Sequence, residues 1–105
     1  MTDKLLVLST AGSESEAQKI AQTLVERRLA ACVNIVPRIQ SVYRWQGKVE
    51  KAEEYLLLIK TVTARKEQVQ SAIRELHSYE LPECIALEVE SGDEKYLAWI
   101  ADSVS

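Results

Sequence analysis

The stretch from Leu29 to Thr61 constrains the fold of this chain more than any other segment. Two long runs rich in apolar, β-branched and aromatic residues flank Gln46 and Gly47, and this pattern predicts a hairpin of two strands. Each strand would have roughly 14 residues, against about 5–6 for an ordinary strand. Such a strand would extend over roughly 45 Å, whereas a compact domain of about 100 residues has a radius of gyration near 13 Å. The hairpin must therefore bend back or project onto a neighbouring molecule.

Before the hairpin, the sequence predicts one strand and one helix. Residues 5–8 form a continuous apolar run, which is typical of a strand buried on both faces. Ser13 is followed three residues later by Glu16, the capping-box pattern of a helix start. Apolar residues then recur at helical spacing as far as Leu29, which predicts an amphipathic helix packed on a sheet.

After the hairpin, the pattern predicts a second helix, a strand and a short terminal helix. Thr63 is placed to cap the second helix, and Pro82 marks its end. Residues 83–90 predict the last strand, and a turn at residues 91–93 precedes the terminal helix. The order strand, helix, strand, strand, helix, strand predicts an α+β fold of the ferredoxin-like type, as one domain over residues 1–105.

That fold leaves one face of the sheet without helices. A solvated face would show alternating apolar and polar residues, but residues 5–8 and 55–59 show no alternation. A second subunit would cover this face, and the terminal helix or a curled hairpin is the alternative cover. Because buried apolar surface contributes about 25 cal/mol per Å², we expect the chain to form a homo-oligomer.

The composition excludes several classes of function. The 105 residues are 47% apolar and 28% charged, which is typical of a single globular domain. A net charge of −3 gives no reason to expect nucleic acid or an anionic membrane as a partner. No apolar run approaches the ~18–20 residues of a membrane span. The first residues lack a signal-peptide pattern, so we expect a cytoplasmic protein with Cys32 and Cys84 reduced.

Motifs for common catalytic chemistry do not occur in the sequence. There is no glycine-rich phosphate loop, no Cys-x-x-Cys and no serine in a nucleophile elbow. Since no activated nucleophile or acid–base pair can be named, we expect the protein not to be an enzyme.

His77, the one histidine of the chain, is the first candidate for a metal ligand. Together with Glu80 it offers the imidazole and carboxylate donors that suit Cu(II), Zn(II) or Ni(II). The alternative is a cationic histidine that interacts with the dipole at the end of the second helix. Cys32 is a further candidate ligand, although a cysteine among apolar neighbours is usually a small buried hydrophobe.

A second candidate site combines aromatic residues with one lysine. Aromatic rings can line a small-molecule cleft in which a lysine binds a carboxylate or phosphate. The same rings can instead be core or interface anchors. The candidate residues are Tyr43, Trp45, Lys60, Tyr79 and Trp99.

Five further segments are spread over the chain: RLAACVNI at 28–35, SVYRWQG at 41–47, KT at 60–61, HSYELPE at 77–83 and YLAW at 96–99. Together these segments resemble the CutA family of divalent-cation tolerance proteins. The resemblance implies a ferredoxin-like subunit in a homotrimer, similar in architecture to PII signalling proteins. It also implies that the long strands join sheets across subunits.

The same resemblance implies a role in the response to divalent metal ions, with no obligatory cofactor. Copper binding is the activity usually inferred for the family, through a cysteine at the end of the first strand and two consecutive histidines. Those positions are Ser9, Leu76 and His77 in this chain, so one of the three implied ligands is present and Cu(II) binding at His77 would be weak. The alternatives are a PII-like carrier or sensor with an intersubunit cleft, or a scaffolding trimer without a ligand.

Overall fold

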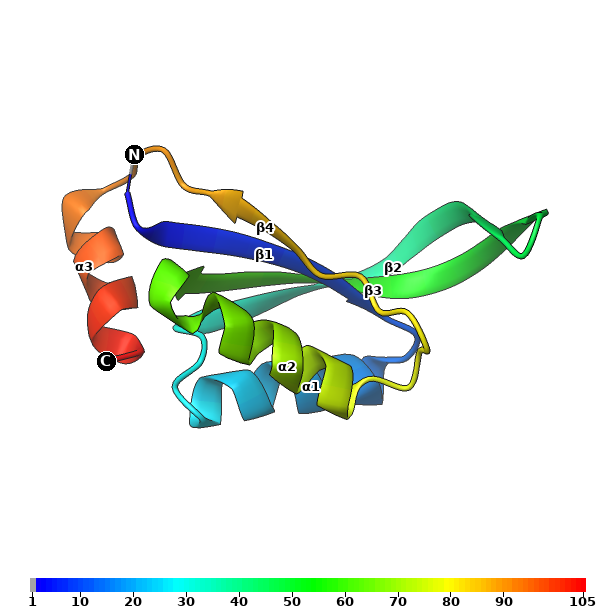
Figure 1. Ribbon diagram of the computed structural model, residues 1–105, viewed down its shortest axis with the longest axis horizontal. Coiled ribbons are helices and arrows are strands. Elements are labelled where there is room, and N and C mark those ends of the chain that lie inside the picture. The colour runs from blue at the N-terminus through cyan, green and yellow to red at the C-terminus, as the bar shows by residue number, and fades with distance from the viewer. Residues whose placement is uncertain (1) are drawn as a thin grey trace.

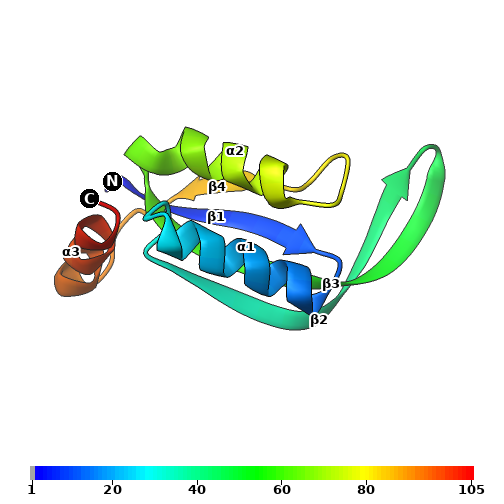
Figure 2. The same ribbon diagram turned by 90° about the horizontal axis from the view of Figure 1, so that it is seen from below.

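One four-stranded antiparallel sheet and three α-helices make up the computed structural model, which describes residues 2–105 (Figure 1). The strand order in the sheet is β2-β3-β1-β4, and α1 and α2 both lie on one face of it (Figure 2). This arrangement confirms the predicted ferredoxin-like α+β fold. The elements in chain order are β1 Lys4–Ala11, α1 Glu14–Glu26, β2 Cys32–Trp45, β3 Lys48–Val62, a 3-10 turn Thr63–Arg65, α2 Lys66–Leu76, β4 Ile85–Glu88 and α3 Glu94–Ser103.

The main core lies between the sheet and the two helices that cover it. Alternate residues of β1 and β3 point toward the helices, and the apolar stripes of α1 and α2 pack against them. The largest fully buried side chains of this core are Val7, Ile20, Leu24, Leu57, Ile59, Val69 and Ile73.

The start of α1 follows only half of the predicted capping box. The hydroxyl of Ser13 accepts a hydrogen bond from the backbone N–H of Glu16 at 3.2 Å. The Glu16 carboxylate does not complete the box, because it accepts hydrogen bonds from the backbone N–H and the hydroxyl of Ser78, after α2. Glu16, which was predicted to stabilise the start of α1, therefore connects α1 to the loop after α2.

The prediction that Thr63 caps the second helix was wrong. A 3-10 turn over Thr63–Arg65 precedes α2, and the hydroxyl of Thr63 donates to the backbone oxygen of Asp3 at 3.1 Å. The backbone N–H of Thr63 donates to the same oxygen at 2.8 Å. Thr63 therefore extends the pairing of β3 with the start of the chain, and this tertiary contact takes the hydroxyl away from the helix.

The long hairpin is present, and it projects beyond the rest of the chain. Its strands have 14 and 15 residues, and the longest dimension of the structure is 44 Å, against 25 and 23 Å for the others. Gln46 and Gly47 at its tip both have positive φ, 50° and 81°, as a two-residue hairpin turn of type I′ requires. The distal half of the hairpin lies outside the region covered by the helices (Figure 1).

A β-bulge changes the direction of the hairpin near its middle. The pairing of β2 with β3 shifts between Val36 and Ile39. Pro37 lies in this gap, and Arg38 beside it has a positive φ of 57°. A bulge leaves one strand with extra residues and increases its bend, and the distal hairpin accordingly bends round toward the loop that follows α2 (Figure 2).

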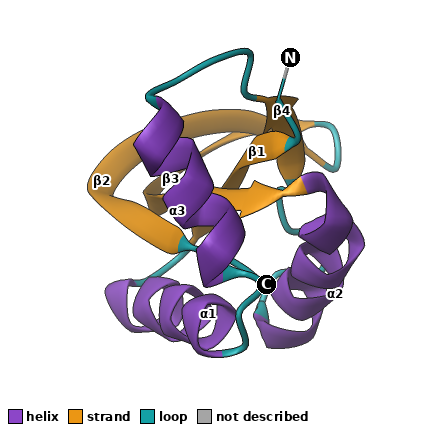
Figure 3. Ribbon diagram, turned by 90° about the vertical axis from the view of Figure 1, so that its left-hand side faces the viewer, coloured by secondary structure: helices purple, strands orange, loops and turns teal. Residues whose placement is uncertain are grey.

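The sheet face opposite α1 and α2 is largely uncovered within the chain. α3 crosses one end of the sheet, where Ile100 and Val104 pack on Ala31 and Val62 (Figure 3). On the rest of this face the side chains of Ile85 and Leu87 are 51% and 47% exposed, beside Leu8 and Leu6 on β1. The terminal helix therefore covers one end of this face, and most of the face stays uncovered within the chain.

Within residues 2–105, the helices are too short and too polar for any of them to cross a lipid bilayer.

Candidate functional site

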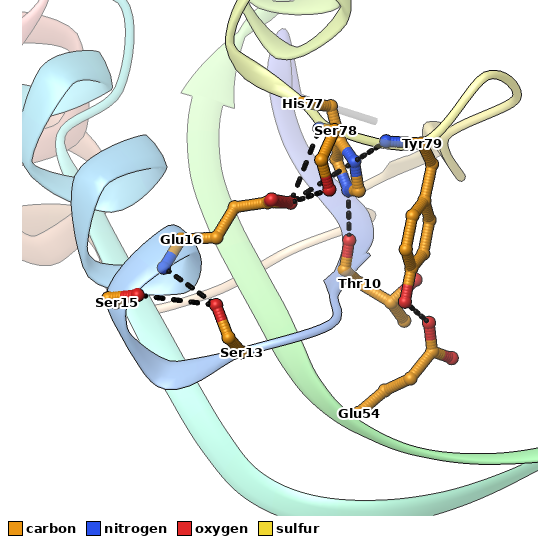
Figure 4. A network of polar contacts seen from close by, with 8 residues as sticks. All are labelled: Thr10, Ser13, Ser15, Glu16, Glu54, His77, Ser78 and Tyr79. Carbon is orange, nitrogen blue, oxygen red and sulfur yellow. Dashed lines mark hydrogen bonds and ion pairs between the residues drawn. The ribbon is translucent and has the colours of Figure 1, made fainter.

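His77 lies at the centre of a polar network that links α1, β1 and the loop after α2 (Figure 4). It ends α2 in an extended conformation, and its side chain is 0% exposed. Its Nε2 atom lies 2.6 Å from the backbone oxygen of Thr10, and its Nδ1 atom accepts the backbone N–H of Tyr79 at 3.0 Å. A carbonyl acceptor at Nε2 and an N–H donor at Nδ1 together define the neutral imidazole with its proton on Nε2.

The carboxylate of Glu16 approaches the same imidazole from α1. Its Oε2 atom lies 3.3 Å from Nδ1 of His77 and accepts the hydroxyl of Ser78 at 3.1 Å. Because Nδ1 already accepts the N–H of Tyr79, no proton lies between the imidazole and the carboxylate in the neutral tautomer. Ser78 therefore supplies the donors that hold Glu16 in place.

The three residues predicted as metal ligands do not converge in one chain. Both nitrogens of His77 are engaged in hydrogen bonds, so neither offers a free lone pair to a metal. Glu80 lies on the wall of a separate cleft, and Cys32 lies at the start of β2, beside Lys60. Over residues 2–105, no three His, Cys, Asp or Glu side chains are grouped so as to hold a metal ion.

Tyr79 extends the network to the hairpin. Its hydroxyl donates to Oε2 of Glu54 at 2.9 Å, and Glu54 is only 7% exposed. Burial of the hydroxyl, followed by the hydrogen bond to Glu54, raises the pKa of Tyr79 to about 12. Although the Tyr79 ring is partly exposed, its hydroxyl lies close against Gly12, because a Cβ on Gly12 would lie 2.8 Å from the hydroxyl oxygen.

A cleft of about 780 Å³ separates the distal hairpin from the loop after α2. It brings together three of the predicted cleft residues, Tyr43, Trp45 and Tyr79. The sequence interpretation missed Glu54, although alternation along β3 puts it on the same sheet face as Leu56 and Leu58. The complete lining is Thr10, Gln40, Ser41, Val42, Tyr43, Arg44, Trp45, Glu54, Tyr79, Glu80, Leu81 and Glu83.

The other two predicted cleft residues, Lys60 and Trp99, do not line this cleft. The Nζ atom of Lys60 donates to Sγ of Cys32 at 3.6 Å and to the side-chain oxygen of Asn34. Sγ of Cys32 also lies 3.6 Å from the hydroxyl of Tyr96, and this contact, followed by burial, raises the pKa of Tyr96. Trp99 packs against Tyr96 on α3, with ring centroids 5.4 Å apart.

The reason for this separation is the antiparallel pairing of the hairpin. Cys32 pairs with Lys60 at one end of β2, whereas Tyr43 and Trp45 pair with Glu50 and Lys48 at the other end. Within one chain, the predicted cleft residues therefore lie in two separate polar and aromatic clusters.

The chain belongs to a class of small α+β proteins with an uncovered sheet face. Three features define this class here: a ferredoxin-like sheet, a hairpin that projects beyond it and a network centred on a buried histidine. Within that class the chain belongs to the family described as CutA1 divalent ion tolerance protein, whose sequence model matches residues 5–103. This finding confirms the family resemblance inferred from the five sequence segments.

Individual relatives are similar over most of the chain. The divalent-cation tolerance protein CutA of Thermus thermophilus is 47% identical over 98 residues, which are 93% of this chain and 95% of that protein. The protein CutA homolog of Xenopus laevis is 44% identical over 90% of this chain, but the chain spans only 63% of that longer relative. The crystal structure of CutA from Xylella fastidiosa has a TM-score of 0.97 and 41% identity, and the match covers 99% of this chain and 100% of that one.

Proposed function

We propose that this protein acts in the tolerance of divalent cations, in a non-enzymatic role, as a cytoplasmic homotrimer. The observation that carries the proposal is membership of the CutA1 divalent ion tolerance family over residues 5–103. The Thermus thermophilus relative, which bears the name divalent-cation tolerance protein, aligns with this chain over nearly its whole length.

The uncovered sheet face supports association of several copies. Ile85 and Leu87 on β4 are about half exposed, and Leu6 and Leu8 lie beside them on β1. Contiguous apolar surface of this kind marks an interaction site in soluble proteins. β2 and β4 are also the two edges of the sheet, so each presents unpaired backbone groups to a neighbouring strand.

The residues of this chain do not fit a tight copper site. Ser9 and Leu76 replace two of the ligands that the family resemblance implies, and the buried His77 uses both ring nitrogens within the protein. A Cu(II) ion at His77 would have to displace the Tyr79 N–H from Nδ1, which leaves that donor unpaired. We therefore propose that direct Cu(II) binding at His77 is weak and that tolerance does not depend on a cage of protein ligands.

Growth under metal stress tests the proposed function. Cells that lack this protein are expected to be more sensitive to added Cu(II) and Zn(II), and expression of the wild-type chain should restore growth. Equal growth with and without the protein over the full range of metal concentrations would contradict the proposal.

The light-scattering mass of the purified protein tests the assembly. The expected mass is three times that of one chain, and a double variant, Ile85→Glu with Leu87→Glu, should have a lower mass because two charges replace apolar contact area. Glu88→Gln is the matched control, since Glu88 lies on the same strand and is already exposed. A wild-type protein with the mass of one chain would refute the trimer.

Calorimetry with Cu(II) tests the weak metal site separately. His77→Ala is expected to weaken Cu(II) binding at least tenfold. The change in Cu(II) affinity of Glu80→Gln measures the contribution of the Glu80 carboxylate. Unchanged binding in His77→Ala would rule out His77 as a ligand.

A further inference from the structure

The cleft between the hairpin and the loop after α2 has charged walls of predominantly one sign. Three carboxylates line it, those of Glu54, Glu80 and Glu83, against the single guanidinium of Arg44. Glu54 is the most deeply placed of these groups, with 7% exposure.

The carboxylate of Glu54 lacks a cationic partner. Its one hydrogen bond to a side chain comes from the neutral hydroxyl of Tyr79. The ion pairs in the described part of the chain are Lys4–Asp3 and Arg27–Glu75, and neither they nor the contact of His77 with Glu16 involves Glu54. Buried charges in proteins are normally paired with an opposite charge, so this carboxylate favours a cation that enters from the cleft.

The spacing of the acidic groups disfavours a metal ion in this role. A metal needs several donors about 2–2.6 Å from one point, and no three acidic, histidine or cysteine side chains in residues 2–105 are grouped in that way. The carboxylates line one cleft without converging on one point. They therefore suit a cation whose N–H donors are spread over several atoms.

Aromatic rings supply the rest of the recognition surface. Tyr43 and Trp45 are two residues apart on β2, so they project from the same face of the strand. Both are about 40% exposed within the chain, at 43% and 40%, and Tyr79 lines the opposite wall. Ring faces attract ammonium and guanidinium groups and also pack on an alkyl chain.

We propose that this cleft binds a small organic cation with ammonium or guanidinium ends on an alkyl body. Glu54 accepts one charged end, and Tyr79 holds that carboxylate in position through its hydroxyl. Tyr43 and Trp45 contact the alkyl body, and Glu80 or Glu83 at the cleft wall accepts the second end. The proposal for this ligand site rests neither on the proposed role in cation tolerance nor on Cu(II) binding at His77.

Calorimetry of the full-length protein with 1,4-diaminobutane and agmatine tests the proposal. Both cations are expected to bind, while 1,4-butanediol, the neutral compound of the same length as the diamine, should not bind. Glu54→Gln keeps the side-chain shape and an acceptor for Tyr79 but removes the charge, and it should weaken binding at least tenfold. Glu53→Gln is the matched control, because Glu53 is the exposed neighbour of Glu54 and does not line the cleft.

A second variant keeps the test decisive if Glu54→Gln folds poorly. Trp45→Leu changes an exposed residue near the tip of the hairpin and should weaken binding of both cations while the circular dichroism spectrum is unchanged. Equal binding of the diol and the diamine, or equal binding by Glu54→Gln and Glu53→Gln, would overturn the proposal. Absence of binding by the wild type would also overturn it, and a lower light-scattering mass of Glu54→Gln would then indicate that a second copy of the chain occupies the cleft.

Discussion

The hydroxyl of Tyr79 donates a 2.9 Å hydrogen bond to the buried carboxylate of Glu54, and this contact joins the loop after α2 to the long hairpin. Hydrogen bonds to charged groups contribute about 1.5–3 kcal/mol. Tyr79→Phe is therefore expected to lower the free energy of unfolding by about 1–3 kcal/mol. Urea denaturation at one fixed protein concentration measures this change, since oligomer stability depends on concentration.

Tyr43→Phe is the control for that comparison. Tyr43 lines the same cleft, but its hydroxyl makes no hydrogen bond in the part of the chain that the structure describes. Its removal should change the free energy of unfolding by less than about 0.5 kcal/mol. Equal effects of the two variants would show that the bond from Tyr79 to Glu54 contributes nothing measurable.

The same contact predicts a loss of stability at alkaline pH. Burial and the bond to Glu54 raise the pKa of Tyr79 from 10.0 to about 12. Between these values the unfolded chain has already lost the phenol proton that the folded chain retains, so the free energy of unfolding falls as pH rises. The contribution is complete below pH 10 and disappears as pH passes 12. Between pH 10 and 12, the free energy of unfolding should fall less in Tyr79→Phe than in the wild type. An equal fall in both proteins would contradict the raised pKa of Tyr79.

Gly12 provides an independent probe of the position of the Tyr79 hydroxyl. A Cβ at Gly12 would lie 2.8 Å from that oxygen and 3.4 Å from the nearest ring carbons. Gly12→Ala should therefore push the hydroxyl away from Glu54 and lower the free energy of unfolding by about 1–3 kcal/mol. In the Tyr79→Phe background, Gly12→Ala should lower the free energy of unfolding by a smaller amount, because the hydroxyl oxygen closest to the new Cβ is absent. A double-mutant cycle measures the difference, and strictly additive effects would argue against the close contact.

The imidazole of His77 is expected to be the neutral tautomer with its proton on Nε2. Nε2 faces the backbone oxygen of Thr10 and Nδ1 accepts the N–H of Tyr79, which requires the neutral Nε2–H tautomer. Nitrogen chemical shifts of the imidazole at neutral pH should report that tautomer. Glu16→Gln should leave it unchanged, because Thr10 and Tyr79 determine it. An imidazolium signal that Glu16→Gln abolishes would instead assign a proton between Nδ1 and Glu16.

Arg65 is expected to anchor the C-terminal helix. Its Nε and Nη2 atoms donate to the backbone oxygen of Val104 at 3.0 and 2.8 Å, just beyond the end of α3. Arg65→Gln should lower the local opening free energy of α3 by about 1–2 kcal/mol. Hydrogen exchange would then be faster at the α3 amides and unchanged at those of α1. Arg74→Gln is the control, since Arg74 is exposed on α2, and equal exchange in both variants would exclude the anchor.

Most of the secondary structure could be predicted because its signals are local. The Gln46–Gly47 turn, the cap at Ser13 and the apolar spacing of the helices each depend on residues close in sequence. The prediction for Thr63 was wrong because the contact that its hydroxyl makes is not local. Its partner is Asp3, 60 residues away, and no local pattern contains that distance.

The composition of the candidate sites was less predictable. The sequence indicated aromatic residues, a lysine and a cysteine as candidates, but it did not indicate which of them lie together within one chain. Cys32 and Lys60 meet at one end of the hairpin, and Tyr43 and Trp45 lie at the other. Strands of 14 and 15 residues separate these groups by most of the length of the molecule.

The sequence by itself therefore determined the element order, the long hairpin and the family, because alternation, helical spacing and turn residues act over a few positions of the chain. Only the tertiary structure decided what the polar residues contact. His77 is buried between α1, β1 and the loop after α2, where both of its ring nitrogens make hydrogen bonds. The bend of the hairpin places Glu54 within hydrogen-bond distance of the hydroxyl of Tyr79. The contacts of His77 with Thr10 and of Tyr79 with Glu54 join residues 67 and 25 positions apart, and their energy depends on desolvation that exists only after the sheet and helices have packed.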